Sequence, residues 1–194
     1  MRIVAILLGA GSARRFGAEK LLHALPHDVP IAVQALRHLK AVFDPKDIVA
    51  VVRPDAGALA ELLRGEGCPV TPCERAGEGM GASLACGVMA AGAADGYLVA
   101  LADMPFIRAS SIAAVRDALA AGAGFAVPFF RARRGHPVGI AGEFRAELER
   151  LQGDEGARAL LLAHAERIVK VPVGDPGVVR DIDTPGDLAP PIVV

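Results

Sequence analysis

The sequence contains no tryptophan and a single tyrosine, and aromatic residues make up only 4% of its 194 residues. Its formal net charge is −1, and lysine and arginine form no long block. General nucleic-acid binding needs an extended basic surface, usually with aromatic side chains on which bases stack. We therefore expect no nucleic-acid partner, and we expect the basic residues that matter to act locally.

Cysteine and long apolar runs are also scarce. Cys68, Cys73 and Cys86 are odd in number and form no CxxC pair, which favours reduced thiols that pack as small apolar side chains over zinc ligands or disulfides. The N-terminal apolar run is too short to span a membrane, and no signal-peptide cleavage pattern follows it. We expect a cytoplasmic protein that makes no membrane contact.

The sequence does contain an alternation of short apolar runs with alanine- and leucine-rich segments of helical spacing. This alternation is typical of a parallel sheet covered by helices, and the length favours a single α/β domain over residues 1–194. The expected strands are Ile3–Leu8, Ile48–Val52, Val70–Cys73, Tyr97–Ala102, Phe125–Phe130, Pro137–Ala141 and Ile168–Val173. The expected helices are Pro30–Val42, Ala56–Arg64, one from Met80 or Gly81, one capped by Ser110 or Ser111, Phe144–Leu151, and one within Gly153–His164.

The segment Leu7–Leu22, LLGAGSARRFGAEKLL, leads from the first apolar run into a basic, glycine-rich loop. Glycines let backbone N–H groups approach an anion, and three cationic side chains accompany them. These loop residues are Gly9, Gly11, Gly17, Arg14, Arg15 and Lys20. The loop is predicted to bind a polyphosphate, although an ordinary glycine-rich turn between a strand and a helix is an alternative.

The spacing within this loop excludes two familiar phosphate-binding motifs. A Walker loop needs four residues between its glycines, whereas five separate Gly11 from Gly17, and Leu21 follows the lysine where serine or threonine is required. A dinucleotide fingerprint starting at Gly9 would need glycine at the position of Arg14. The arginines and the lysine therefore belong to a phosphate loop of another kind.

Two aspartates follow apolar residues late in the chain. Asp103 comes directly after the run YLVALA, and Asp183 lies between Ile182 and Thr184. Ligands of open α/β sheets bind beyond the carboxyl ends of the strands, and Mg²⁺ prefers one or two carboxylates together with phosphate oxygens and water. The two aspartates predict a Mg²⁺ site for phosphate chemistry that relies on positioning and electrostatics. The alternative for Asp103 is a cap or turn residue before Pro105, and for Asp183 a helix cap.

Six motifs in order resemble the MobA-like nucleotidyltransferases, and most closely the molybdenum cofactor cytidylyltransferases (MocA-like). The first loop agrees with that family at Gly11, Arg15, Phe16, Gly17 and Lys20, whereas Gly9 replaces the usual alanine. The motifs that follow are GMGASL (79–84), ADMP (102–105), RGHPV (134–138), GDEGAR (153–158) and DIDTPGDL (181–188). Each motif alone is weak, but the ordered set is specific and covers nearly the whole chain.

The resemblance implies a three-layer α/β/α Rossmann-like fold with a mostly parallel central sheet. It implies transfer of CMP from CTP to the phosphate of molybdenum-bearing molybdopterin, with release of pyrophosphate and with Mg²⁺ held by Asp103 and Asp183. The residues implied as catalytic are Arg15, Lys20 and Asp103. Those implied to bind the nucleotide are Leu8, Gly9, Ala10, Gly11, Arg15, Lys20, Gly79, Ser83 and Asp103, and those implied to bind the acceptor are His136, Asp154 and Arg158.

Several alternatives stay open at this point. Ala10 stands where guanylyl-transferring relatives have glycine, which favours CTP over GTP, but another nucleotide or another phosphorylated acceptor is compatible with the motifs. His136 is equally well interpreted as a packing residue, and Arg158 as part of a solvated face. A non-catalytic protein that carries molybdenum cofactor to a recipient molybdoenzyme is a further alternative. Retention of Lys20, Asp103 and Asp183 favours catalysis, because binding alone does not require both carboxylates.

Overall fold

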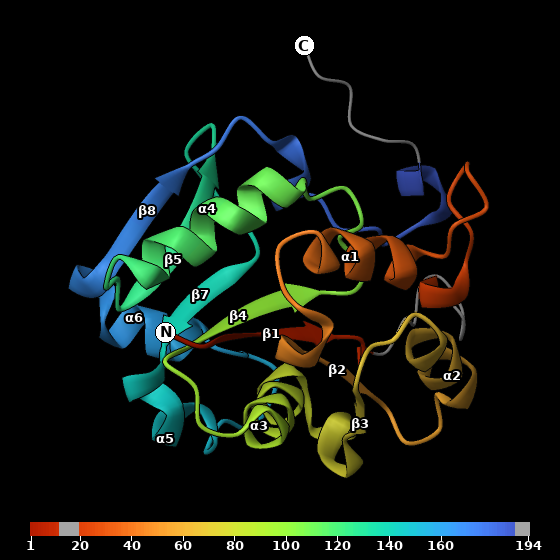
Figure 1. Cartoon of the computed structure of the whole chain (residues 1–194), viewed down its shortest axis with the longest axis horizontal. Helices are drawn as coiled ribbons and strands as arrows, with labels where there is room; N and C mark the ends of the chain where they lie inside the picture. The colour runs from red at the N-terminus through yellow and green to blue at the C-terminus, as the bar shows by residue number, and fades with distance from the viewer. Residues whose placement is uncertain (12–19, 189–194) are drawn as a thin grey trace.

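In the computed structural model, which describes residues 1–11 and 20–188, eight strands form one sheet between two layers of helices (Figure 1). The strands are β1 (Ile3–Leu8), β2 (Ile48–Val52), β3 (Val70–Pro72), β4 (Gly96–Leu101), β5 (Phe125–Phe130), β6 (Arg133–Arg134), β7 (Val138–Ala141) and β8 (Ile168–Pro172). The α-helices are α1 (Ile31–Lys40), α2 (Gly57–Gly65), α3 (Met80–Ala91), α4 (Ala109–Ala120), α5 (Arg145–Leu148) and α6 (Arg158–Ala163). Short 3₁₀ turns include η1 (Lys20–Leu22), η3 (Glu74–Glu78), η6 (Pro176–Val179) and η7 (Pro185–Leu188).

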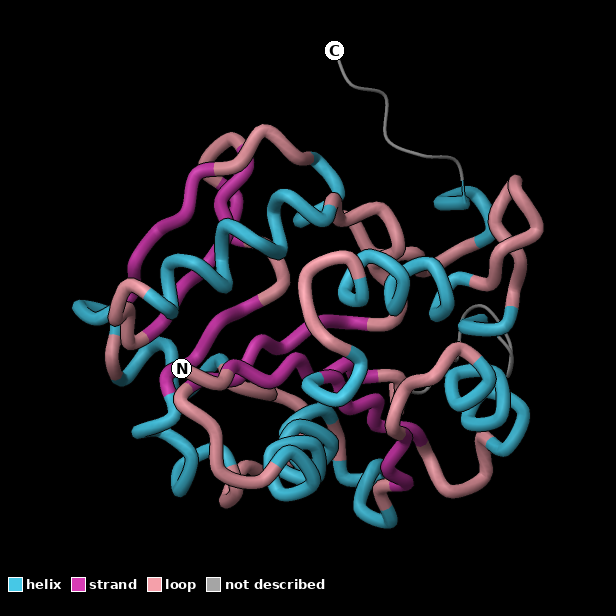
Figure 2. Tube along the Cα trace, viewed as in Figure 1, coloured by secondary structure: helices cyan, strands magenta, loops and turns pink. Residues whose placement is uncertain are grey.

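The strand order is β3-β2-β1-β4-β7-β5-β6, with β8 paired to β5. Strands β1 to β4 are parallel, β8 is parallel to β5, and β7 runs antiparallel to both β4 and β5. Figure 2 shows the strands in magenta with helices in cyan on both sides of them. The chain passes from β1 outward through β2 to β3 and then returns to place β4 on the other side of β1 (Figure 1). The order therefore reverses between β1 and β4, and a ligand crevice is expected at their carboxyl ends.

The side chains of β1 alternate between two hydrophobic cores, one on each face of the sheet. Ile3, Ala5 and Leu7 join the core formed with α1, α2 and α4, whereas Val4 and Ile6 join the core formed with α3, α5 and α6. A strand that is buried on both faces appears in the sequence as a continuous apolar run. The expected three-layer arrangement with a mostly parallel sheet is confirmed.

The expected strands all form, with ends that differ by at most one residue from the sequence prediction. The basic turn after β5 contains the additional two-residue strand β6, which pairs back onto β5. The helix expected over Phe144–Leu151 is shorter, because Phe144 belongs to a preceding 3₁₀ turn and the helix ends at Leu148. No helix in the described part of the chain combines the length and the hydropathy needed to cross a bilayer.

The expectation that Ser110 or Ser111 caps α4 is wrong. The helix begins at Ala109, so both serines lie within its first turn. The cap comes instead from Asp175, which is 3% exposed. Its carboxylate accepts hydrogen bonds from the Arg108 backbone N–H (2.8 Å) and from Ser111 Oγ (2.7 Å), and it also accepts one from the Gly177 N–H (2.9 Å). A residue far away in the sequence therefore accepts the hydrogen bonds of donors at the start of α4.

Replacing Asp175 with alanine is expected to lower the free energy of unfolding by about 3 kcal/mol, because the partly buried donor at Arg108 and the buried donors at Ser111 and Gly177 lose their acceptor. Urea denaturation followed by circular dichroism measures this change. Asp117→Ala on the same helix is the control, since Asp117 is exposed and pairs only with its neighbour Arg116 among the described residues. Equal stability of the two variants would contradict the capping role.

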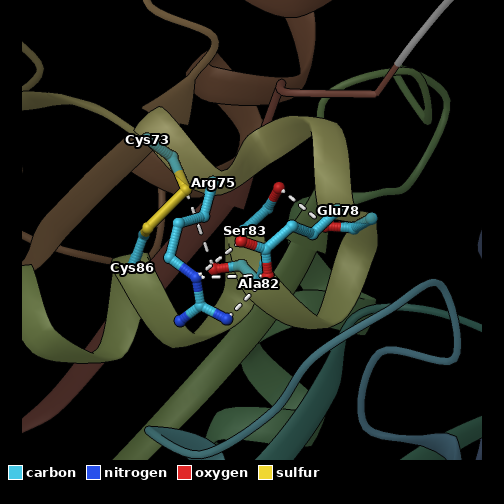
Figure 3. The surroundings of a disulfide bond; sticks show 7 residues. Cys73, Arg75, Glu78, Ala82, Ser83 and Cys86 are labelled. Atoms are coloured by element: carbon cyan, nitrogen blue, oxygen red, sulfur yellow. Dashed lines mark hydrogen bonds and ion pairs between the residues drawn. A yellow bond between two sulfur atoms is a disulfide. The ribbon is translucent and has the colours of Figure 1, made fainter.

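The expectation of three reduced cysteines is wrong for two of them. Cys73 at the end of β3 and Cys86 in α3 form a disulfide with Cα atoms 6.0 Å apart (Figure 3). The pairing arises because α3 folds back beside β3, and an odd cysteine count without CxxC spacing does not show it. Cys68 stays a buried thiol, and burial raises its pKa to about 11. The cysteines therefore provide no argument for a reducing compartment.

Candidate active site

A cleft of about 530 Å³ lies beyond the carboxyl ends of β1, β2 and β4. This is the edge at which the strand order reverses, as expected for a ligand site in an open α/β sheet. Most of the residues predicted for the site line this cleft: Leu8, Gly9, Ala10, Gly11, Lys20, Gly79, Ser83, Asp103, Asp154 and Asp183. Arg15, which was predicted to act beside Lys20, lies outside the described residues.

Lys20 joins the two predicted metal ligands in one cluster. Its Nζ lies 3.0 Å from Asp103 Oδ2 and 3.6 Å from Asp183 Oδ1, and its side chain is 9% exposed. The turn η1 presents Lys20 from the end of the first loop, and Asp103 follows β4. Two carboxylates separated by 80 residues of sequence thus face the same ammonium group in the cleft.

The C-terminal segment is fixed to the end of β4 by its backbone. The Ile182 N–H donates to the Asp103 carbonyl oxygen (2.9 Å), and the Ile182 side chain is buried against Leu25 and Ile31. Asp187 accepts hydrogen bonds from the Thr184 N–H (2.9 Å) and Oγ1 (2.7 Å). Asp187 therefore performs the capping role that was the alternative for Asp183, and the carboxylate of Asp183 pairs with Lys20.

Burial is the dominant influence on Asp103. It raises the pKa of this carboxyl group above the ordinary value, the neighbouring Lys20 ammonium opposes the rise, and the negative charge of Asp181 adds to it. The ionised form of a partly desolvated carboxylate next to other acidic groups is stabilised most strongly by a nearby cation. The site therefore favours the binding of a cation beside the Asp103 carboxylate.

The glycine-rich segment before α3 forms one wall of the cleft. Gly79 has a φ of 128°, and a Cβ atom there would collide with Asp154 Oδ1 and the Gly153 backbone. The Gly81 N–H donates to the Gly153 carbonyl oxygen (2.7 Å), and Ser83 Oγ donates to the Gly79 carbonyl oxygen (3.1 Å). The GMGASL and GDEGAR motifs therefore meet backbone to backbone, and this contact places Asp154 in the cleft.

The cleft lining does not include two of the three predicted acceptor-binding residues, His136 and Arg158. His136 follows Gly135, which packs so closely on the Val178 backbone that a Cβ atom has no room, and the His136 N–H donates to the Val178 carbonyl oxygen (2.8 Å). Burial lowers the pKa of His136 to about 4. Arg158 is the exposed first residue of α6. An acceptor-binding role of these two residues stays a prediction.

Arg53 lines the cleft but was not predicted. It directly follows β2 and is held by Asp55 through two hydrogen bonds of 2.9 Å. Asp103 was predicted because it stands directly after a buried strand, and the same rule applies to Arg53. It belongs to none of the family motifs, so the resemblance gave no reason to select it.

The donor set suits Mg²⁺ that shares its ligands with a substrate. Asp103 and Asp183 supply hard carboxylate oxygens around one point of the cleft. Within residues 1–11 and 20–188, no group of three or more histidine, cysteine, aspartate or glutamate side chains could hold a metal ion by itself. A cation here would therefore need phosphate oxygens and water to complete its coordination, as Mg²⁺ does in nucleotide sites.

A lysine and two carboxylates at the switch point of a Rossmann-like sheet suit the chemistry of a nucleotidyltransferase. The solved structures with similar folds include enzymes of this class, among them a nucleotidyl transferase from Methanothermobacter thermautotroptrophicus, with a TM-score of 0.79 and 22% identity over 95% of this chain and 93% of that chain. The family model described as MobA-like NTP transferase domain matches residues 5–168, and the chain belongs to this family.

Two further relatives cover nearly the whole chain. Purine catabolism protein PucB of Bacillus subtilis (strain 168) is 29% identical over 199 residues, which cover 94% of this chain and 92% of PucB. The structure of Rv0371c from Mycobacterium tuberculosis H37Rv has a TM-score of 0.81 and 24% identity over 96% of this chain and 94% of that chain. At these identities the solved structures establish the shared fold, and the family match establishes nucleotide transfer as the class of activity.

Proposed function

We propose that the protein is a Mg²⁺-dependent cytidylyltransferase that transfers CMP from CTP to the phosphate of molybdenum-bearing molybdopterin. The products are the molybdopterin cytosine dinucleotide cofactor and pyrophosphate. The observation that carries the proposal is the meeting of Lys20, Asp103 and Asp183 in the cleft beyond β1 and β4. The choice of CTP and of the pterin acceptor rests on the ordered motifs, and the recipient of the product would be a molybdoenzyme in the cytoplasm.

The reaction is a single in-line displacement. An oxygen of the acceptor phosphate forms a bond to the α-phosphorus of CTP, the bond from that phosphorus to the bridging oxygen of the β-phosphate breaks, and pyrophosphate leaves with the electron pair. Asp103 and Asp183 would hold Mg²⁺, which when bound neutralises charge on the reacting phosphates. Lys20 donates to phosphate oxygens as charge grows on the pyrophosphate, and Arg15 is proposed to do the same.

Other residues that line the cleft are proposed to bind the nucleotide without taking part in the displacement. Gly9, Ala10 and Gly11 line the cleft at the end of β1, where a nucleotide would cross, and Gly79 and Ser83 line it at the start of α3. Ala10 is buried, so its methyl group takes space that glycine would leave open. This favours a pyrimidine over a purine, and GTP is the second candidate nucleotide.

Structures of relatives support a divalent metal and a pterin acceptor. One structure of Rv0371C is a complex with manganese, with a TM-score of 0.77 and 22% identity over 96% of both chains. Another relative is molybdopterin-guanine dinucleotide biosynthesis protein A from Archaeoglobus fulgidus, with a TM-score of 0.66 and 21% identity over 95% of this chain and 94% of that chain. We extend both properties to this protein as part of the proposal.

The test is release of pyrophosphate from CTP, GTP, ATP and UTP, each with Mg²⁺ and with molybdenum cofactor as the acceptor. We expect release that depends on both the metal and the acceptor, fastest with CTP. Faster release with GTP would replace the cytidylyl assignment by a guanylyl one. Binding of the cofactor without pyrophosphate from any nucleotide would favour the carrier alternative and contradict the catalytic proposal.

A further inference from the structure

Arg53 is a cationic side chain in the cleft that the proposed chemistry leaves without a role. It stands at the carboxyl end of β2 and is 42% exposed, so a ligand in the cleft can reach it. Lys20 already pairs with the two carboxylates that face the reacting phosphates. We therefore expect Arg53 to contact another part of the same ligand.

The strand order sets how far Arg53 lies from the reaction centre. Strands β2 and β4 flank β1 on opposite sides, so Arg53 and Asp103 follow strands that are two positions apart in the sheet. Two strand spacings amount to about 10 Å. That separation matches an extended nucleotide whose α-phosphate lies at Asp103 and whose base lies over the end of β2.

Asp55 holds the guanidinium of Arg53 in a fixed orientation. Arg53 Nε donates to Asp55 Oδ1 and Arg53 Nη2 donates to Asp55 Oδ2, both at 2.9 Å. A guanidinium has five N–H donors, and this fork-to-fork pair uses two of them. The described residues show no other acceptor for Arg53, so the edge formed by Nη1 and Nη2 is available for a second bidentate partner.

The nucleobases differ in whether they can accept two such hydrogen bonds side by side. Cytosine offers N3 and O2 as adjacent acceptors, and guanine offers O6 and N7, whereas a donor interrupts the corresponding edges of uracil and adenine. We propose that Arg53 selects the nucleobase in the nucleotide-transfer site proposed above by donating two hydrogen bonds to adjacent acceptors. Arg53 then favours CTP over UTP and GTP over ATP, while Ala10 favours the smaller pyrimidine.

The test measures equilibrium binding of CTP, UTP, GTP and ATP in the presence of Mg²⁺ by calorimetry. In Arg53→Met the affinity for CTP is expected to fall by about tenfold to a hundredfold, since a good bidentate contact to a base has this effect on discrimination. The affinity for UTP is expected to change by less than about threefold. Asp55→Asn is expected to give a smaller loss for CTP, because it weakens the hold on the guanidinium.

Arg37→Met is the matched control. Arg37 is a half-exposed arginine on α1 that pairs with Glu66, and it does not line the cleft, so its variant is expected to bind all four nucleotides as the wild type does. An equal loss for all four nucleotides in Arg53→Met would assign Arg53 to the phosphates and overturn the inference. Unchanged discrimination would also overturn it. If the wild type bound none of the nucleotides, the proposed function itself would fail.

Discussion

Replacing Asp103 with asparagine is expected to slow pyrophosphate release from CTP by about a thousandfold. Asparagine keeps the size of the side chain and an acceptor for Lys20, so the hydrogen bond of 3.0 Å can persist. What disappears is a negative charge in a partly buried place, where electrostatic interactions with a cation are stronger than in water. The loss is therefore expected in the chemical step, with a much smaller effect on the affinity for the nucleotide.

Single-turnover pyrophosphate release at saturating Mg²⁺ and CTP measures this effect. Asp117→Asn is the control, because Asp117 is exposed on α4 and does not line the cleft. Circular dichroism and the midpoint of urea unfolding establish that both variants are folded. A rate for Asp103→Asn within tenfold of the wild type would exclude Asp103 as a metal ligand in the reaction.

Strands β1 and β2 could be predicted because they are buried on both faces. Ile3–Leu8 and Ile48–Val52 are short, continuous apolar runs. Such runs are typical of strands that are buried on both faces of a parallel sheet. The same reasoning placed Asp103 at the site, since a carboxylate directly after such a strand lies at the sheet edge where ligands bind. Local sequence therefore determines most of the sheet and the β4 side of the cleft.

Contacts between distant parts of the chain could not be predicted. The cap of α4 comes from Asp175, 67 residues after the Arg108 N–H that it accepts. The disulfide joins Cys73 and Cys86 only because α3 packs beside β3. In each case the local sequence offers a reasonable alternative, a serine cap or a free thiol, and only tertiary structure decides between them.

The motif RGHPV shows the same limit for functional residues. A motif indicates that a residue type matters, but it does not say whether the residue contacts a ligand or another segment. Gly135 has no room for a side chain against Val178, and the backbone of His136 bonds to the same residue. Close packing of the segment between β6 and β7 on η6 is therefore sufficient to explain the glycine, independently of any acceptor.

His136 predicts a specific dependence of stability on pH. Burial lowers its pKa to about 4, with a backbone hydrogen bond at Val99 opposing the shift, and its Nδ1 has neither solvent access nor a hydrogen-bond partner among the described residues. In the unfolded chain the ring titrates near its ordinary value of 6.5. Between these values the unfolded state binds a proton that the folded state does not, so stability is full above pH 6.5 and falls as the pH drops toward 4.

The expected loss from this one group is about 2–3 kcal/mol between pH 7 and pH 4. Because carboxylates also titrate in this range, the measurement is the difference in unfolding free energy between the wild type and His136→Asn at several pH values. His27→Asn is the control, since His27 is exposed and its variant is expected to follow the wild-type curve. The wild type should lose more stability than His136→Asn on acidification. Parallel curves for all three proteins would show that His136 is protonated in the folded protein, and its ring would then have to find a partner that the buried Nδ1 does not have in this structure.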